Sequence, residues 1–239
     1  MKRISLYLGH EHDCSYLPGR MARSVYVDPD TPMNEPLYSA LIGQGFRRSG
    51  ELVYRPHCPS CSACVPVRVP AARFVPNRSQ ARALRSNADL TIRRKPAAFD
   101  EAHYRLFSRY LAARHAQGGM ASSSREEYIQ FLAASWIQSS FVEFRLGDEL
   151  LAVAVVDYLE DALSAVYTFF DPGHASRSLG VNAILWQIEE VRRLGLTWLY
   201  LGFWVEHCRK MAYKNQYRPL QALIGGQWRD FEKGEKIQG

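Results

Sequence analysis

The chain has 239 residues, of which 47% are hydrophobic and 23% charged, a balance typical of a globular protein with a sizeable core. No apolar run reaches the roughly 18 residues that a membrane span needs. The N-terminal segment MKRISLYLGHEHDC is a poor signal peptide, so we expect a cytoplasmic protein. The net charge of +6 is compatible with a polyanionic partner without requiring one.

Turn-forming residues dominate the first part of the chain, from about residue 10 to residue 70. Pro18-Gly19 and Asp28-Pro29-Asp30 are examples, and such pairs interrupt regular structure. A helix is expected only at about 36–45, and a strand at 65–69, where apolar and polar residues alternate. We therefore expect residues 1–95 to form an N-terminal subdomain that contains the cysteines.

The cysteines form one compact pattern. Cys58, Cys61 and Cys64 are each separated by two residues, a spacing that lets successive thiolates face one ion or cluster. Cys14 or His57 could supply a fourth ligand. Three thiols packed in a tight turn would give the same pattern, so the sequence allows a zinc or iron–sulfur site but requires no cofactor. An odd, clustered set in a cytoplasmic protein argues against disulfides.

Basic residues gather just after this pattern, in a segment with a helix expected at 78–87 and a short strand at 90–94. The segment from residue 68 to residue 95 has a single acid, Asp89. This run could be a solvated linker or a phosphate-binding surface. Its basic residues are Arg68, Arg73, Arg78, Arg82, Arg85, Arg93, Arg94 and Lys95.

Regular elements follow one another closely from residue 97 onward. A helix is expected at 97–117, ended by Gly118-Gly119, and a capping box at Ser124–Glu127 starts a second helix. The remaining expected elements are strands at 140–146, 150–158 and 162–170, a polar loop at 171–179, a helix at 180–194 and a strand at 197–205.

This order matches the acyl-CoA N-acyltransferase architecture. We therefore predict an α+β fold in which residues 96–239 form a central, mostly antiparallel sheet flanked by helices. In that architecture the loop before the last helix binds a pyrophosphate through backbone N–H groups. Here the matching turn, Arg177-Ser178-Leu179-Gly180, has a single glycine where that architecture has a glycine-rich turn. This disfavours an acetyl-CoA-dependent acetyltransferase.

The last strand runs into a cationic and aromatic segment, YLGFWVEHCRKMAYKNQYRP, at residues 200–219. Strict alternation would put Leu201 and Phe203 on one face and Gly202 and Trp204 on the other. Gly202 would let a backbone or a ligand approach closely. The segment suits an anionic, nucleotide-bearing ligand, although a core strand followed by a solvated helix explains it equally well.

Four blocks of the chain together resemble the arginyl- and leucyl-tRNA–protein transferases. The length, the CSYLPGR opening and the HCPSCSAC turn resemble the family's bacterial branch. That branch moves leucine from leucyl-tRNA onto proteins that begin with Asp or Glu, which creates an N-degron degradation signal; an arginyl donor is the alternative. The eukaryotic relatives open with a CxxC pair, but Cys14 here is followed by Leu17, so their metal site does not carry over directly. The four blocks are Cys14–Arg20, Tyr54–Val69, Val166–Gly180 and Tyr200–Pro219.

The reaction that this resemblance implies needs no enzyme nucleophile, because an aminoacyl ester is already activated toward amines. Asp171 is a candidate base or amine anchor, although an Asp before Pro also starts turns. Tyr213 and Tyr217 could stack on the terminal adenine or donate to the ester oxygen. An acidic acceptor or the RNA phosphates would need cations, for which the candidates are Arg20, Arg68, Lys210, Lys214 and Arg218.

Two further surfaces are expected from the same requirements. Arg78, Arg82 and Arg85 would contact the tRNA body. Phe169, Phe203 and Trp204 would line a pocket for the leucyl side chain. Cys208 next to His207 is better explained by core packing than by nucleophilic catalysis.

Overall fold

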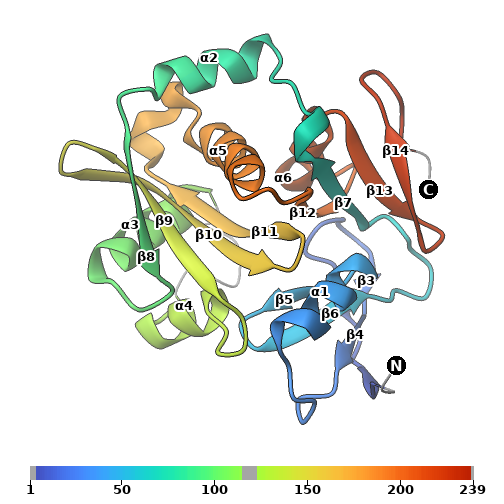
Figure 1. Ribbon diagram of the computed structural model, residues 1–239. Coiled ribbons are helices and arrows are strands. Elements are labelled where there is room, and N and C mark those ends of the chain that lie inside the picture. Colours follow the sequence, from blue (N-terminus) through green and yellow to red (C-terminus); the bar gives the residue numbers. More distant parts are fainter. Residues whose placement is uncertain (1–3, 115–122, 238–239) are drawn as a thin grey trace.

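The computed structural model describes residues 4–114 and 123–237 (Figure 1). The first part of the chain forms short strands and two helices: β1 (Leu6–Leu8), β2 (His12–Asp13), β3 (Met21–Ala22), β4 (Ser24–Val27), α1 (Glu35–Gly43), β5 (Arg47–Ser49), β6 (Leu52–Pro56), β7 (Val65–Pro70), α2 (Arg78–Ser86) and β8 (Thr91–Pro96). The second part consists of α3 (Glu101–Arg114), α4 (Arg125–Leu132), β9 (Ser139–Leu146), β10 (Glu149–Leu159), β11 (Ala162–Phe170), α5 (Leu179–Arg193), β12 (Trp198–Trp204), α6 (Arg209–Ala212), β13 (Leu220–Ile224) and β14 (Gln227–Phe231), with 3-10 helices at Pro172–Arg177 and Tyr213–Gln216.

One large sheet dominates the fold, with the strand order β14-β13-β7-β12-β11-β10-β9-β8. Only β11 and β12 are parallel, and their other neighbours in the sheet are antiparallel. The predicted α+β fold with a mostly antiparallel central sheet is therefore confirmed. Strand β7 and all of β8 except Pro96 lie before the predicted domain boundary, so the sheet contains strands from both sides of it.

Helices cover both faces of this sheet (Figure 1). Leu185 and Ile188 of α5 share a core cluster with β-strand residues such as Val67 and Leu201, and α2 packs on α5. On the other face, Phe107 of α3 packs in a second cluster with residues of α4 and the central strands. The third cluster joins α1 and the small sheet β1-β4-β6-β5 to the same face near β12.

Two helix starts show how the local sequence specifies these elements. Ser124 accepts from the backbone N–H of Glu127, whose side chain reaches back to Ser124, so the predicted capping box is confirmed. Asn77 and Gln80 form a second capping box at the start of α2. Helix α3 is described to Arg114; its predicted extension to Gln117 and the Gly118-Gly119 terminator lie outside the described residues.

The predicted alternation along β12 is wrong beyond Tyr200. The register against β7 shifts between Tyr200 and Gly202, and Gly202 has φ of 76°, a conformation that costs a residue with a Cβ appreciably. This bulge places Trp204 in the cluster that contains Leu201, while Phe203 faces the opposite side with Tyr200. A positive φ at one residue therefore exchanges the faces of the two that follow.

The parallel pairing of β11 and β12 is short. Only Ala162–Ser164 pair with Trp198–Tyr200, and the two strands separate beyond this point. Backbone N–H and C=O groups in such a gap still need hydrogen-bond partners when they are buried. Side chains from other elements therefore have to enter the gap.

Arg48 fastens the N-terminal subdomain to the large sheet. Its Nε and Nη2 donate to the two carboxylate oxygens of Asp157 on β10, at 2.7 and 2.6 Å, and both side chains are fully buried. Nη2 also donates to Leu132 O, at 2.9 Å. Breaking a buried ion pair from one side leaves an uncompensated charge in the interior. The pair therefore constrains where β5 can lie.

We expect Asp157→Ala to lower the free energy of unfolding by about 3–5 kcal/mol, because Arg48 would be left buried without its counter-ion. Asp230→Ala removes one of the two acidic partners of Arg73 in exposed ion pairs and is the matched control, with an expected loss of about 0–1 kcal/mol. Urea denaturation of both variants and the parent measures this. Equal losses would show that the Arg48–Asp157 pair does not anchor β5.

Candidate functional site

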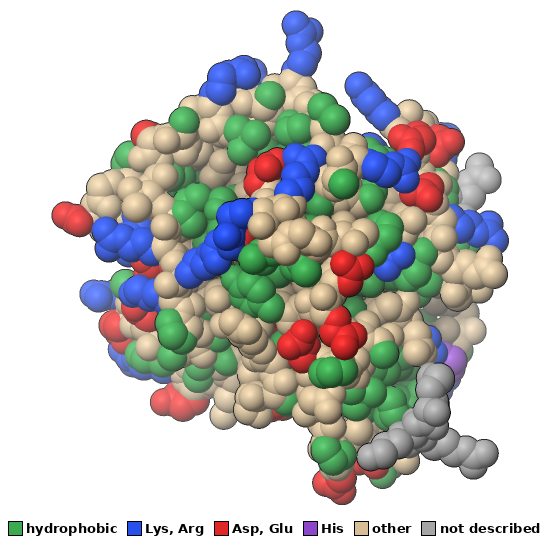
Figure 2. All heavy atoms as spheres, in the orientation of Figure 1, with side chains coloured by type: hydrophobic (Ala, Val, Ile, Leu, Met, Phe, Trp, Pro, Cys, Tyr) green, Lys and Arg blue, Asp and Glu red, His purple; other side chains and the backbone are tan. Residues whose placement is uncertain are grey.

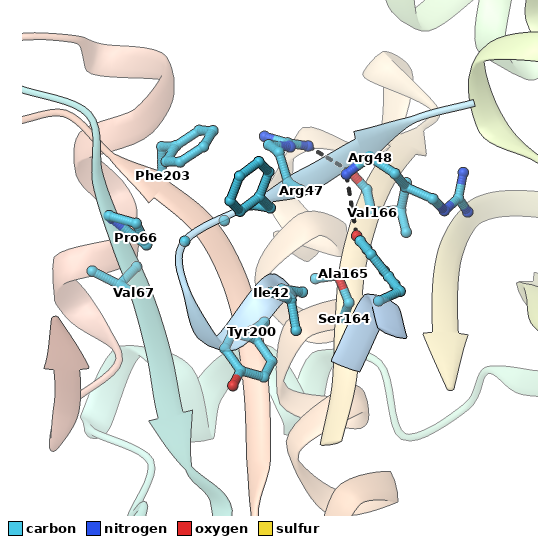
Figure 3. Close-up of a pocket in the computed structure, with 14 residues that line it drawn as sticks. Ile42, Arg47, Arg48, Pro66, Val67, Ser164, Ala165, Val166, Tyr200 and Phe203 are labelled. Atoms are coloured by element: carbon cyan, nitrogen blue, oxygen red, sulfur yellow. Dashed lines mark hydrogen bonds between the residues drawn. The ribbon is translucent and has the colours of Figure 1, made fainter. Parts of the chain in front are cut away.

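Arg47 occupies the gap between the separating strands. It is on β5, next to the fixed Arg48, and its Nη2 donates to Val166 O on β11 at 3.4 Å. Its guanidinium lies 5.7 Å from the centre of the Phe203 ring. Figure 3 shows Arg47 between Val166 and Phe203, with Pro66 beyond. The N-terminal subdomain thus delivers a cation into the large sheet.

Lys214 enters the same gap from the side of β12. It belongs to the 3-10 helix Tyr213–Gln216 and is only 4% exposed. Its Nζ donates to Phe203 O at 2.6 Å and to the sulfur of Met211 at 3.6 Å. Burial, and then the charge of Arg47, hold the pKa of Lys214 well below its usual value.

The two cations meet at Gly202. A Cβ built on this glycine would stand 3.3 Å from Arg47 Nη1 and 3.9 Å from Lys214 Nζ. Among the described residues, neither cation forms an ion pair with a carboxylate. We call Arg47, Gly202 and Lys214 the cation site. Two buried positive groups around one side-chain-sized space suit a small anion such as a carboxylate.

Phenol groups surround the cation site. Tyr16, Tyr54 and Tyr213 all interact electrostatically with Arg47. Desolvation raises the pKa of Tyr213 to about 12 although 41% of the residue is exposed, as expected for a concave surface where solvent reaches the ring and protein surrounds the hydroxyl. These phenols remain neutral hydrogen-bond donors near pH 7 and add no negative charge.

The space beneath the cation site is small. Its volume is about 20 Å³, which is room for about one water molecule. Tyr38 and Ile42 of α1, together with Val166 and Tyr200, form part of its walls. The site can therefore hold a small polar group at its mouth but not a leucyl side chain in its interior.

Asp171, the predicted base, caps the 3-10 helix at the end of β11. Its Oδ1 accepts from Gly173 N at 2.8 Å and its Oδ2 from Arg109 at 2.9 Å. The contact with Gly173 N agrees with the interpretation of Asp171 as a residue that starts a turn. Both oxygens are engaged by donors, and the catalytic role of Asp171 stays a prediction.

The other predicted cations do not join the cation site. Arg68 donates to Gln221 and Tyr200 and is stacked between Trp198 and Trp228, at 3.7 and 4.2 Å from the ring centres. Arg218 donates to the carbonyls of Asn215, Glu232 and Glu235, which holds the C-terminal segment. Arg20 donates to Cys61 Sγ at 3.5 Å, and Lys210 is exposed on α6.

Three predicted ligand contacts are wrong. Tyr217 is only 1% exposed and stacks on Phe74, so its ring is core and cannot stack on an adenine. Phe169 and Trp204 lie in two different core clusters, so they cannot line one leucyl pocket with Phe203. Cys208 is buried, which confirms its predicted packing role.

The basic segment divides into paired and unpaired residues. Arg73 and Arg94 form ion pairs with acids from distant segments, Lys95 pairs with the nearby Asp100 and with Glu143 on β9, and Asp89 pairs with Arg177. Arg78, Arg82 and Arg85 lie exposed along α2 at helical spacing, and no ion pair to a described carboxylate is seen for them. Figure 2 shows Lys and Arg side chains on the surface over α2. This basic face of α2 remains the predicted tRNA surface.

The four predicted metal-site cysteines lie together, close to the cation site. Burial, and then the thiolates of Cys14, Cys58 and Cys61, raise the pKa of Cys64 to about 12. Cys14 Sγ accepts from Leu17 N at 3.4 Å, and Cys58 Sγ accepts from Arg23 N at 3.5 Å.

This donor set fits zinc or an iron–sulfur cluster, which four thiolates hold. The cysteine sulfurs are not among the described groups of three ligand atoms within 4.8 Å of one another, so a metal would draw them closer. In one of the groups that meet this distance, Asp100 and Glu143 pair with Lys95, and His103 pairs with Glu143.

Arg47 is the functional residue that the sequence analysis missed. Arg47 and Arg48 are adjacent on the short strand β5. Nothing in the sequence shows that Arg48 forms a buried ion pair whereas Arg47 belongs to the candidate site. The signal that could have found it is the requirement for a cation opposite Gly202, which needs the three-dimensional position of β5.

Comparison with known proteins gives two family matches. Residues 12–82 match the family described as "Arginine-tRNA-protein transferase, N terminus", and residues 102–224 match the corresponding C-terminal family. The predicted boundary at residue 95 falls between these two matched regions.

Curated relatives cover almost the whole chain. A protein of Thiobacillus denitrificans named aspartate/glutamate leucyltransferase is 53% identical over 97% of this chain and 96% of its own length. Proteins of the same name from Alcanivorax borkumensis and Pseudomonas putida are 51% and 50% identical, over 92% and 95% of this chain and 90% and 97% of their own lengths.

Similarity to solved structures is weaker. FemX is 8% identical with a TM-score of 0.45, over 83% of this chain and 79% of that chain. L-PGS from Bacillus licheniformis is 13% identical with a TM-score of 0.45, over 59% and 45% of the two chains.

We expect the purified chain to carry one metal centre on Cys14, Cys58, Cys61 and Cys64, which stabilises the N-terminal subdomain and takes no part in the chemistry. Elemental analysis should find the metal in the parent and in Cys208→Ala, which keeps all four ligands, but not in Cys61→Ser. A fully folded parent without zinc, iron or sulfide would show that the four thiols only pack together.

Proposed function

The chain belongs to the arginine-tRNA-protein transferase family, and from this membership we infer an aminoacyltransferase that moves leucine from leucyl-tRNA to the N-terminal amine of proteins beginning with Asp or Glu. The transferred leucine would mark the acceptor for degradation through the N-degron pathway. Both substrates would be met in the cytoplasm. No helix among residues 4–114 and 123–237 is long and apolar enough to cross a membrane.

The observation that carries this proposal is the cation site. An acceptor that begins with Asp or Glu brings a carboxylate, and Arg47, beside Lys214 and Gly202, offers a positive charge that no described carboxylate neutralises. Charge-assisted hydrogen bonds of this kind are stronger than neutral ones, and Arg can bind a carboxylate through two donors. An Asn or Gln side chain has the same shape but would leave Arg47 uncompensated.

The remaining requirements of the reaction are positional. Leucyl-tRNA presents an ester, so catalysis consists of holding the acceptor amine against the carbonyl carbon and stabilising the oxyanion that develops. With the acidic side chain held at Gly202, the acceptor amine is placed at the mouth of the gap between β11 and β12. The Tyr213 phenol, which burial keeps protonated, is positioned there as a donor to the oxyanion.

The charge of the cation site also bears on the choice of donor. An arginyl group near Arg47 would meet like charge, whereas a leucyl group adds none. This consideration supports leucine over arginine.

A transfer assay tests the proposal. Peptides that differ only in an N-terminal Asp, Glu, Asn or Gln are incubated with labelled leucyl-tRNA, arginyl-tRNA or acetyl-CoA. We expect leucine on the Asp and Glu peptides, with kcat/KM at least about 30-fold above the Asn and Gln peptides, because a lost charge-assisted contact at a buried site costs about 2–5 kcal/mol. Transfer of arginine, or equal transfer to Asn peptides, would contradict the assignment.

The basic face of α2 generates a separate prediction about the donor. Reversal of Arg78, Arg82 and Arg85 to Glu should weaken leucyl-tRNA binding by at least 10-fold and reduce the salt dependence of the binding constant, because fewer phosphate counterions are released. Binding is measured by fluorescence anisotropy at several salt concentrations. Reversal of Arg209 and Arg229, which are exposed away from α2, is the control. An unchanged salt slope in the α2 variant would place the tRNA elsewhere.

A further inference from the structure

Lys214 combines three properties that a substrate contact alone does not explain. It is almost fully buried, it has no carboxylate partner among the described residues, and it lies beside a second cation. The charged and titratable groups that face it are Arg47 on β5, Cys208 before α6 and Cys64 before β7. Its hydrogen bonds go to Phe203 O and Met211 Sδ, and not to a cysteine sulfur.

Such an environment disfavours the ammonium form. Removing an isolated charge from water costs several kcal/mol, and a buried lysine lowers this cost by giving up its proton. Arg47 cannot do so, because guanidinium remains protonated in proteins. In the free protein Lys214 therefore gives up its proton and becomes a neutral amine, which removes the repulsion between its charge and that of Arg47.

The reaction needs a proton acceptor at this place. An α-amino group has a pKa of about 7.7–8.0, so near neutral pH the acceptor arrives mostly as an ammonium ion that cannot attack an ester. A base must lie within hydrogen-bond reach of this ammonium. The Asp171 oxygens are engaged by Arg109 and Gly173, whereas Lys214 Nζ lies at the point where an acceptor side chain would sit.

We propose that Lys214 is the base that removes the proton from the acceptor's α-ammonium group, and that the acceptor's own carboxylate, held by Arg47, makes it basic enough to do so. The proposal rests on the function proposed above. A carboxylate at Gly202 cancels the charge of Arg47, which is one of the causes of the low basicity of Lys214. An Asn side chain in the same place cancels nothing, so the charge of the substrate controls turnover as well as binding.

The proton and electron movements balance with the release of one proton to water. One α-ammonium proton moves to Lys214 Nζ, and the freed nitrogen lone pair forms a bond to the ester carbonyl carbon. As the tetrahedral centre collapses, the bond between that carbon and the ribose oxygen breaks, and the ribose oxygen takes a second proton from the former amine nitrogen, which becomes the amide N–H. Lys214 then releases its proton to water and returns to its neutral form.

The pH dependence of turnover tests this role. In the parent, turnover of an Asp peptide should rise with pH through the lowered pKa of Lys214 and then level off. In Lys214→Met, single-turnover rates should fall by at least about 100-fold and keep rising through the pKa of the acceptor amine. Lys233→Met, an exposed lysine after β14, is the matched control and should keep the parent profile.

Folding and rescue distinguish a base from a structural residue. Lys214→Met should melt no lower than the parent, because it removes a buried amine beside Arg47. Primary amines of graded basicity should restore turnover to Lys214→Ala in proportion to their basicity. A Lys214→Met variant with the parent's pH profile, or with a raised KM and unchanged turnover, would overturn the proposal.

A direct titration separates this inference from the proposed function. The lysine ¹³Cε signal that Lys214→Met removes should report a neutral amine in the free protein at pH 7. Addition of an Asp peptide should move it toward the ammonium shift, whereas an Asn peptide should not. A charged Lys214 in the free protein would overturn the inference even if leucine transfer is observed. A protein that transfers no leucine while Lys214 titrates in this way would instead refute the proposed function.

Discussion

The candidate site depends on the separation of β11 and β12, which pair in parallel within the large sheet over three residues. Strands β11 and β12 share three register pairs and then separate, which leaves carbonyl groups of both strands without a neighbouring strand. Arg47 satisfies Val166 O and Lys214 satisfies Phe203 O. The need to pair backbone groups thus brings two cations into a buried gap, and the absence of a Cβ at Gly202 leaves space between them.

The second constraint is the buried pair between Arg48 and Asp157. It joins β5 of the N-terminal subdomain to β10 of the large sheet and so sets the position of the neighbouring Arg47. The cysteine cluster belongs to the same subdomain, and Cys64 lies near Lys214. The site is therefore built by both halves of the chain, in agreement with family matches that cover both.

Much of the second half of the fold could be predicted from the sequence. Strands such as β11 and the capped helix α4 carry strong local signals, and those elements form as expected. The small sheet of β1, β4, β5 and β6 was not predicted, because its strands are three to five residues long and are held by pairing between distant segments. Long-range pairing of this kind leaves little trace in a local pattern.

The candidate site was predicted only in part, for a related reason. Lys214 was among the expected cations because it follows an aromatic strand, but its burial depends on the bulge at Gly202, which alternation does not reveal. Arg47 could not be selected, because its importance arises from the position of β5 across the gap. Tyr217 was expected at the surface, and its contact with Phe74 shows that an aromatic residue in a basic segment can belong to the core.

The central claim is that Arg47, in the cation site that it forms with Gly202 and Lys214, recognises the carboxylate of an acidic N-terminus. The most direct test is calorimetric binding of a peptide beginning with Asp and of its Asn counterpart to the parent and to Arg47→Met. The account predicts that the parent prefers the Asp peptide by at least 10-fold and that Arg47→Met binds the two peptides equally. An undiminished preference for Asp in Arg47→Met would contradict it.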